Sequence, residues 1–386
     1  MAKLGEVCEF YAGTGFPNEY QGRVTGKYPF YKVGDISKNV LEGNRELKTC
    51  ANYVEEDVVQ KLKGSILPPK TIVFAKIGEA LKLNRRAITS CECLVDNNVM
   101  GIKAQNVRLN DEYLFYWLQN LNLSDYSEST TVPSVKKSRL QNIEINVNPL
   151  EEQEKVVSTL NKLSSLILAR KKQLSKLDEL VKARFVEMFG GYVPNAKLSD
   201  VASITGGLTK NSNRNKMKLK LPYLRVANVS YAKIDVSEML EIGLTEDEKA
   251  KTLLSHDDLL FVEGNGSPDQ IGRVALWRNE ITPCVHQNHL IKARFISHLI
   301  VPCFALYYFM SQEGRKQIRS KAVSTSGLYT LSVSKISNLL IPTPPLSLQN
   351  QFATFVERVD QQKQTVQQSL EKLELMKKAL MQEYFG

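Results

Sequence analysis

The sequence predicts an α+β protein (mixed α/β) in which two duplicated globular domains are separated by two long helices that form an antiparallel intramolecular coiled coil. The first observation behind this prediction is a duplication: Gln153 and Phe189 recur as Gln349 and Phe385, at one offset of 196 residues and without a gap. Solenoid repeats are only about 20–50 residues long, so a whole module is duplicated. The other two observations are strand-like runs in each half and a heptad pattern in each long helix.

The duplication divides the chain into four segments. We expect a globular domain at 1–148, a long helix at 149–191, a second globular domain at 192–345 and a second long helix at 346–386. At 386 residues the chain is long enough for two domains that each bury a core. A pseudo-twofold axis that relates the two halves makes the helices antiparallel.

The globular halves share short β-branched and aromatic runs punctuated by Gly, Pro, Asn and Asp, which is typical of strands. Longer aromatic runs at 113–120 and 304–312 predict helices packed on a sheet. Because strands do not alternate regularly with helices, the pattern argues against a doubly wound nucleotide-binding fold. The paired segments are 28–36 with 221–229, 71–74 with 258–261, Arg86–Ala87 with Arg273–Val274, Asn97–Asn98 with Gln287–Asn288, and 113–118 with 304–309.

Each long helix carries a heptad pattern over roughly five heptads, which is the signature of a coiled-coil seam. The alternative structure, an amphipathic helix packed on a globular core, agrees less well with the sequence because the apolar stripe is narrow. The seam positions are Val156, Leu160, Leu163, Ile167, Leu174, Leu177, Val181 and Met188, interrupted by Arg170 and Arg184, and Phe352, Val356, Val359, Val366, Leu370, Leu373, Leu380 and Tyr384, interrupted by Lys363 and Lys377.

Composition limits the classes of protein that the chain can belong to. The net charge is +10, from 51 basic and 41 acidic residues, and the excess lies mainly in 192–345. A mild basic excess suits a polyanionic partner but is a weak signal on its own. Six cysteines without dense pairing, no apolar run of about 18 residues and no signal-peptide pattern predict a cytoplasmic protein without a membrane segment.

Two globular domains, a P-L-x-x-Q helix entry and a heptad helix ending in Phe-Gly, each present twice, resemble the specificity (S) subunits of type I restriction-modification enzymes. The resemblance covers essentially the whole chain. It is strongest at 149–153 and 344–349, and the Ser- and Thr-rich segments 130–140 and 324–336 resemble the family's lead-in to these helices. The second entry departs from the acidic Glu-Glu pattern, with Ser347 and Leu348 there, although a serine can cap a helix.

The resemblance implies two target-recognition domains, each of which reads half of a split, asymmetric sequence in double-stranded DNA. It also implies that the helices set the spacing of the half-sites and dock two methyltransferase (M) subunits, and that restriction/translocase (R) subunits complete the complex. No cofactor is expected. Helix geometry agrees with a spacing role, since about 36 residues span roughly 54 Å, or about one and a half turns of B-DNA.

Catalytic motifs are not readable in the sequence, so we expect a subunit that is not itself an enzyme. The loop 261–266 imitates a methyl-donor loop, but it lacks the spacing, the following helix pattern and the downstream acidic residue. The N-P-P-[YFW] step of amino-methyltransferases and the phosphate-binding G-x-x-x-x-G-K-[ST] loop do not occur. Asp35 with Glu46 and Lys48 imitates a nuclease triplet, but the second half has Asn228 in place of Asp35.

A metal site is also not expected. Cys284, His286 and His289 have a superficially metal-like spacing, but a structural zinc site needs a fourth ligand and usually a C-x-x-C knuckle, and neither is evident nearby. Buried cysteines and ordinary polar or half-buried histidines are the preferred interpretation.

DNA contacts require Lys, Arg, Ser, Thr or Asn at phosphates and Arg, Asn or Gln at base edges. A solvated surface explains each charged run equally well, so the candidates are a broad set. The strongest basic patch is the loop 210–220, with five basic residues and three asparagines. The candidates are Lys76, Lys82, Asn84, Arg85, Arg86, Asn97, Asn98, Lys136, Lys137 and Arg139 in the first half, and Lys210, Asn211, Asn213, Arg214, Lys216, Lys218, Arg273, Gln287, Asn288, Tyr329 and Lys335 in the second.

Three other functions compete with a specificity subunit. The chain can be the DNA-recognition subunit of another defence or methylation system, in which the exposed faces of the helices select a different enzyme. It can be a self-contained endonuclease or methyltransferase, which would be active as a purified chain with Mg²⁺ or S-adenosylmethionine. It can also be a structural coiled-coil adaptor, which would bind DNA only weakly and in a salt-sensitive way.

Overall fold

The computed structural model describes residues 1–105, 107–128, 132–296, 298–325 and 327–386. Thr130 and Thr131 of the first Ser- and Thr-rich segment, and Ser326 of the second, lie outside the described residues. The chain forms two compact units, one of residues Met1–Lys172 with Gln367–Gly386 and one of residues Gln173–Val366. Among the described residues, no helix combines the length and apolar character needed to cross a bilayer.

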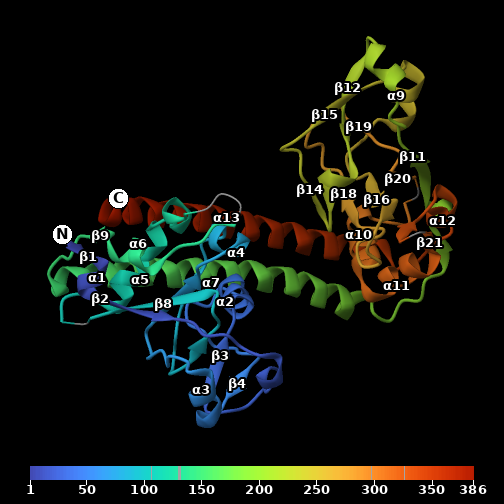
Figure 1. Ribbon diagram of the computed structural model, residues 1–386. Helices are drawn as coiled ribbons and strands as arrows, with labels where there is room; N and C mark the ends of the chain where they lie inside the picture. The colour runs from blue at the N-terminus through green and yellow to red at the C-terminus, as the bar shows by residue number, and fades with distance from the viewer. Residues whose placement is uncertain (106, 129–131, 297, 326) are drawn as a thin grey trace. The chain divides into compact units, whose positions relative to one another are not determined.

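Each unit contains half of both long helices (Figure 1). Helix α7 (Leu150–Phe189) begins in the first unit and ends in the second, and α13 (Leu346–Phe385) begins in the second and ends in the first. A globular domain completes each unit. The predicted fold class, with duplicated mixed domains and two long helices, is confirmed.

In the first unit an antiparallel sheet has the strand order β2 (Cys8–Ala12), β8 (Val99–Ala104), β5 (Ile72–Ala75), β6 (Arg86–Ile88). A smaller sheet has the order β4 (Tyr53–Val54), β3 (Tyr28–Tyr31), β7 (Leu94–Val95). Buried aromatic residues of α5 (Asp111–Asn120) pack on the larger sheet. The other elements are β1 (Ala2–Lys3), α1 (Leu4–Val7), η1 (Asn18–Tyr20), α2 (Val33–Leu41), α3 (Glu56–Leu62), α4 (Glu79–Lys82), η2 (Leu123–Tyr126), α6 (Lys137–Gln141) and β9 (Glu144–Ile145).

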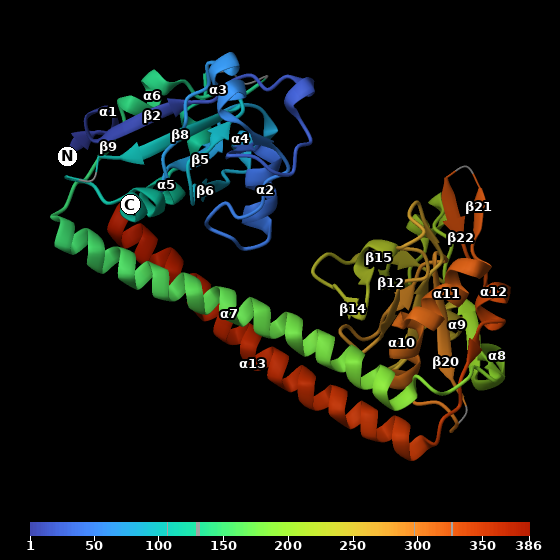
Figure 2. The ribbon, with the colours of Figure 1, turned by 90° about the horizontal axis from the view of Figure 1, so that it is seen from below.

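The second unit repeats both sheets with the same strand orders. Figure 2 labels strands of each larger sheet, among them β8 in the first unit and β20 in the second. Its larger sheet is β11 (Ala202–Gly206), β20 (Leu290–Phe295), β16 (Leu259–Val262), β18 (Val274–Leu276), and its smaller sheet is β15 (Leu240–Gly243), β12 (Lys220–Leu224), β19 (Val285–His286). The other elements are β10 (Ala196–Lys197), α8 (Leu198–Val201), η3 (Ser212–Lys216), η4 (Val226–Asn228), β13 (Val229–Ser230), β14 (Lys233–Ile234), α9 (Glu246–Thr252), β17 (Gly264–Asn265), α10 (Pro302–Met310), α11 (Gln312–Lys321), β21 (Val323–Thr325), β22 (Leu328–Thr330), α12 (Val333–Ser337) and β23 (Leu340–Ile341).

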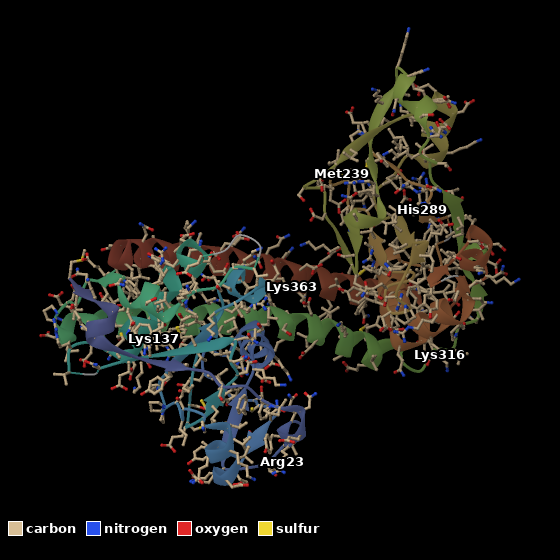
Figure 3. All side chains as sticks on the ribbon, viewed as in Figure 1. Arg23, Lys137, Met239, His289, Lys316 and Lys363 are labelled. Atoms are coloured by element: carbon tan, nitrogen blue, oxygen red, sulfur yellow. The ribbon has the colours of Figure 1, made fainter. Side chains whose placement is uncertain are left out.

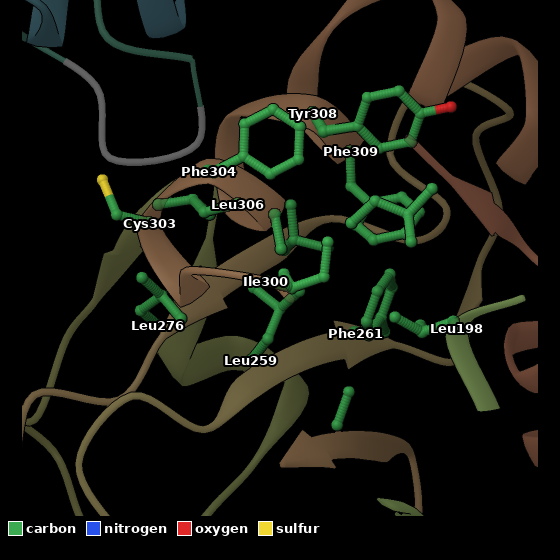
Figure 4. Close-up of a cluster of buried hydrophobic side chains, with 14 of the residues drawn as sticks. Leu198, Leu259, Phe261, Leu276, Ile300, Cys303, Phe304, Leu306, Tyr308 and Phe309 are labelled. Atoms are coloured by element: carbon green, nitrogen blue, oxygen red, sulfur yellow. The ribbon is translucent and has the colours of Figure 1, made fainter. Parts of the chain in front are cut away.

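The second core shows why the aromatic runs are helical. Phe304 and Phe309 of α10 face Leu259 and Phe261 of β16 (Figure 4), with the rings of Phe261 and Phe309 5.1 Å apart. A run that is apolar on nearly every side suits a helix enclosed between a sheet and other helices. The predicted run 304–312 is too long by two residues, because the Ser311 hydroxyl accepts a hydrogen bond from Gly314 N and caps a new helix, α11.

Strand register corrects two of the pairings between the halves. Asp96 and Gln287 hold the same bridge position, opposite Thr14 and Leu208 respectively. Asn97–Asn98 therefore corresponds to Asn288–His289, one residue later than the sequence suggested. The register of a strand is set by its hydrogen bonds to neighbouring strands and is not visible along the strand itself, which explains this error.

The second corrected pairing involves the arginines at the start of β6 and just before β18. Phe74 lies opposite Arg86, and its counterpart Phe261 lies opposite Val274. Arg86 therefore corresponds to Val274, and Arg273 corresponds to Arg85. The pairing of 28–36 with 221–229 is correct, because Asp35 caps one helix and Asn228 the other, each accepting a hydrogen bond from the backbone three residues earlier.

Two buried glutamines fix the starts of the long helices in the same way. The Gln153 amide donates to Arg108 O and Asn148 O and accepts from Asn110 N, at distances of 2.7–2.9 Å. The Gln349 amide donates to Leu299 O and Pro344 O and accepts from Val301 N, each at 2.8 Å. Both side chains are fully buried. The repeated P-L-x-x-Q motif is thus a connection between a helix and its globular domain.

The heptad positions are the covered positions of the two long helices. All of the predicted seam residues are buried or half-buried, including the interrupting Arg170, Arg184, Lys363 and Lys377. The antiparallel direction appears in two ion pairs, Lys171–Glu374 at 2.8 Å in the first unit and Asp178–Lys363 at 2.6 Å in the second. The heptad count missed one anchor, Phe185, whose ring lies 5.4 Å from that of Phe352.

Candidate nucleic-acid interface

The structure brings part of the predicted basic set together at one edge of the first globular domain. Lys76 follows β5, and Lys136 and Lys137 lie at the start of α6, where Lys137 is labelled in Figure 3. These three lysines, with Phe10 and Tyr11, line a hollow of about 330 Å³. The Lys76 backbone amide donates to Asn98 O at 2.8 Å, which places the turn 97–98 beside the hollow. We call Lys76, Asn98, Lys136 and Lys137 the first edge.

The second globular domain has the same backbone arrangement with different side chains. Glu263 N donates to His289 O and Leu331 N donates to Glu263 O, as Lys76 N does to Asn98 O and Val135 N to Lys76 O. Glu263 and His289 therefore take the places of Lys76 and Asn98, and Nδ1 of His289 lies 2.8 Å from Oε2 of Glu263. We call Glu263, His289, Tyr329 and Lys335 the second edge.

The chemistry of the two edges differs although their backbone is shared. The first edge presents lysines and an amide, and the second presents a carboxylate paired with a histidine. Base edges are distinguished by their pattern of hydrogen-bond donors and acceptors. The two edges thus present different patterns of donors and acceptors on equivalent backbone positions. Glu263 and His289 were missed as interface candidates because only strand register reveals their position.

Two of the predicted arginines lie inside the protein. The Arg86 guanidinium, 4% exposed, donates to Leu121 O at 2.6 Å and to Asn84 O and Oδ1. Arg214, 8% exposed, makes a two-pronged ion pair with Glu248, at 2.7 and 3.0 Å. Both side chains hold distant segments together and lie outside the first and second edges.

The other predicted residues are distributed over several surfaces. Asn84 is also structural, since its side chain bonds Leu121 O and Leu123 N. Lys82 pairs with Glu79, Lys136 and Arg139 lie near Glu128, and Arg273 donates to Gln270 and Val226. The exposed candidates are Lys82, Asn97, Asn98, Lys136, Lys137, Arg139, Lys210, Asn211, Asn213, Lys216 and Lys218, and the half-buried ones are Lys76, Asn84, Arg85, Arg273, Gln287, Asn288, Tyr329 and Lys335.

The metal-like and enzyme-like patterns have structural explanations. Cys284 and His286 are buried, and among the described residues no group of three His, Cys, Asp or Glu side chains can hold a metal ion. The segment 261–266 that imitates a methyl-donor loop contains the end of β16 and all of β17, and β17 pairs with β22. In the nuclease-like triplet, Asp35 caps α2 and Glu46 pairs with Lys70 at 3.3 Å.

The burial of His286 predicts that the second unit loses stability in acid. Its Nδ1 lies 2.9 Å from Leu290 O, its Nε2 has no hydrogen-bond partner among the described residues, and burial lowers its pKa to about 4. The unfolded chain binds this proton near pH 6.5 and the folded chain only near pH 4, so stability falls as the pH falls through that window.

We expect His286 alone to cost about 3 kcal/mol of unfolding free energy between pH 6.5 and pH 4. His286→Val introduces the residue that the first domain has at the equivalent position, Val95, and should remove this dependence. The measurement is the free energy of unfolding in urea of the native chain and of His286→Val at pH 7 and pH 4. Subtracting one protein's change from the other's cancels the titration of the carboxylates that both contain. Equal acid sensitivity in both would contradict the assignment.

Comparisons with known proteins agree with the duplicated architecture. The chain matches the type I restriction modification DNA specificity domain twice, at residues 1–179 and 193–375. It is 31% identical over 197 residues to the MjaX specificity subunit of Methanocaldococcus jannaschii and 25% identical over 258 residues to the StySPI specificity subunit of Salmonella potsdam. These matches span about half of those relatives, 44% and 54% of their lengths.

Other comparisons extend over the whole chain. The MjaVIII specificity subunit of M. jannaschii is 23% identical, with 99% of this chain and 90% of that protein covered. The fold is similar to the S subunit of M. genitalium, with a TM-score of 0.54 and 14% identity over all of this chain and 95% of the other. A chain from a study of type I R-M complex assembly gives a TM-score of 0.57 and 17% identity, covering 96% of that chain.

The two family matches together span most of the 386 residues. They coincide with the duplication seen in the strand orders and in the glutamine-anchored helices. The chain belongs to the type I restriction modification DNA specificity family, whose curated relatives here are specificity subunits of restriction enzymes.

Proposed function

We propose that this chain is the non-catalytic sequence-reading subunit of a type I restriction-modification complex, and that each globular domain reads one half of a bipartite, asymmetric site in double-stranded DNA. The observation that carries the proposal is the pair of edges, which share a backbone and differ in side chains. Two copies of one reader with unlike contact groups suit a target whose halves differ. The domain limits that we propose are 1–148 and 192–345.

The first edge supplies the contacts that a reader needs. Lys136 and Lys137 are exposed and suit phosphates, which fix the position of a protein on DNA without reading sequence. Lys76 and the turn with Asn97 and Asn98 lie next to them and carry groups that can bond base edges. On the second domain, the exposed lysines of the 210–218 loop suit phosphates in the same way.

The long helices are the proposed docking sites for two M subunits, with R subunits completing the complex. Their seam residues face inward, yet Leu180 and Met376 are 48% and 53% exposed. The two lie at the same offset of 196 residues as the glutamines, so each helix presents an apolar side chain at an equivalent position. One exposed apolar side chain at the equivalent position of each helix suits two copies of one partner.

Methylation mapping tests the proposal. The chain is co-expressed with a type I methyltransferase (M) subunit from the same organism, and methylated bases are mapped across the host genome. A split, asymmetric motif that appears only in the presence of this chain is the expected result. If a stable complex forms without new methylation, a different enzyme system is indicated, and if no complex forms the structural-adaptor function is favoured.

An exchange of one domain tests the division of labour between the halves. Replacing residues 1–148 with the corresponding domain of another specificity subunit should change one half of the methylated motif and leave the other half unchanged. The reciprocal exchange of residues 192–345 is the matched control and should change the other half. If both halves change together in either exchange, the domains do not read independently.

A further inference from the structure

A cationic cleft in the first unit lies apart from the first edge. The hollow, of about 220 Å³, is formed between the loop after α2, helix α5 and the two long helices, and it adjoins a second hollow of about 410 Å³. Its basic lining residues are Arg45, Arg86, Lys171 and Lys377. We call it the stem cleft.

Only part of this positive charge is neutralised inside the protein. Arg45 pairs with Glu112 at 3.0 Å, and Lys171 pairs with Glu374 at 2.8 Å. Lys377 lies 5.6 Å from the centre of the Tyr116 ring, and burial beside Arg45 and Lys171 lowers its pKa. Four cations thus face two carboxylates.

Arg86, the most buried of the four basic residues, has one nitrogen without a hydrogen-bond partner among the described residues. Its terminal nitrogens bond backbone and amide oxygens, but its Nε is buried and has no hydrogen-bond partner among the described residues. Burial also lowers the pKa of Arg86 to about 9. A buried guanidinium facing backbone oxygens rather than a carboxylate favours an anion close to it.

The duplication supplies an internal comparison. In the second unit, the helix positions equivalent to Lys171 and Lys377 hold Gln367 and Val181. The strand position equivalent to Arg86 holds Val274. The pairing of the two long helices therefore forms in the second unit without the two lysines, and packing alone does not require them. Clustered charge that costs desolvation and serves no common structural need is typical of a binding site.

We propose that the stem cleft binds a phosphate group through Arg45, Lys171 and Lys377, with Arg86 behind them. Lysine and arginine are the usual phosphate-binding side chains, arginine because its planar fork matches the oxygens. Ser164 and Gln119 add neutral donors to the lining. The phosphate is either in the DNA backbone or in a free phosphate-containing ion, and only the DNA source rests on the proposed function.

The sharpest test replaces Lys377 with the residue of the other half, Lys377→Val. Val181 shows that the seam accepts valine at this position, so the variant should fold and, without phosphate, melt at a higher temperature than the native chain. The matched control is Lys363→Gln, which removes another seam lysine of the same helix outside the cleft. Inorganic phosphate, compared with chloride at equal ionic strength, should raise the melting temperature of the native chain and the control but not of Lys377→Val.

A second measurement identifies the source of the phosphate. The complex with the methyltransferase is titrated with its target DNA at several salt concentrations. Each phosphate contact contributes about 0.9 to the slope of log K against log[salt], so Lys171→Gln combined with Lys377→Val should lower the slope by roughly 2 if the phosphate is that of DNA. An unchanged slope with a retained response to inorganic phosphate indicates a free ion.

Two outcomes separate the failure of this inference from the failure of the proposed function. If phosphate raises the melting temperatures of all three proteins alike and the salt slopes are equal, the stem cleft is not a phosphate site. The other outcome is that no complex binds DNA specifically, while phosphate raises the melting temperature of the native chain and of the control but not that of Lys377→Val. In that case the stem cleft is a phosphate site and the DNA-reading function is wrong.

Discussion

Replacing the buried glutamine at the start of α13, Gln349→Leu, is expected to destabilise the chain by roughly 3–5 kcal/mol. Leucine has nearly the same size, so the change tests hydrogen bonding rather than packing. The native amide bonds Val301 N and Pro344 O at 2.8 Å in a fully buried position. Buried backbone groups that lose a partner cost about 1–3 kcal/mol each.

The measurement is the free energy of unfolding in urea, with Gln351→Leu as the control. Gln351 is exposed on the same helix two residues further on, so its replacement should change stability by no more than about 0.5 kcal/mol. Gln153→Leu should reproduce the loss in the first unit. Since natural proteins are stable by only about 5–15 kcal/mol, the double variant should be largely unfolded. Equal effects of Gln349→Leu and Gln351→Leu would show that the amide does not anchor the helix.

Features that depend on local spacing could be predicted from the sequence. The seam needs only a repeat of 3.5 residues, and the burial of Leu160, Val181 and Val356 follows from it. The position of Gln153 and Gln349 could be found from the constant offset, although their hydrogen bonds could not. Those bonds join the helix to segments roughly 40–50 residues earlier, whose approach is set by the packing of the domain.

Features that depend on long-range partners could not be predicted. Arg214 stands in the most basic loop of the chain and yet is buried, because Glu248 of α9 reaches it from 34 residues away. Arg86 is buried for a similar reason, with Leu121 O as its partner. The equivalence of Asn98 and His289 required the strand register, because a slip of one residue along a strand leaves composition unchanged while it turns every side chain to the other face.

Lengthening both long helices by one heptad is expected to widen the gap between the two methylated half-sites by about three base pairs. Seven residues add roughly 10.5 Å to a helix, and B-DNA rises 3.4 Å per base pair. The insertions belong where the helices face one another, between Lys171 and Asp178 in α7 and between Lys363 and Glu374 in α13. A whole heptad keeps the seam in phase, so the sequence read by each domain should stay the same.

The control is an insertion of five residues at the same two places. Five residues turn the seam by about 500°, which leaves it roughly 140° out of phase at 3.6 residues per turn, so the pairing and the complex should be lost. Three additional base pairs also rotate one half-site by about 100° relative to the other, at about 10.5 base pairs per turn. We therefore expect weaker binding of the widened site as well. Methylation mapping gives the spacing directly, and an unchanged gap in a folded, heptad-extended chain would show that the helices do not measure the distance between half-sites.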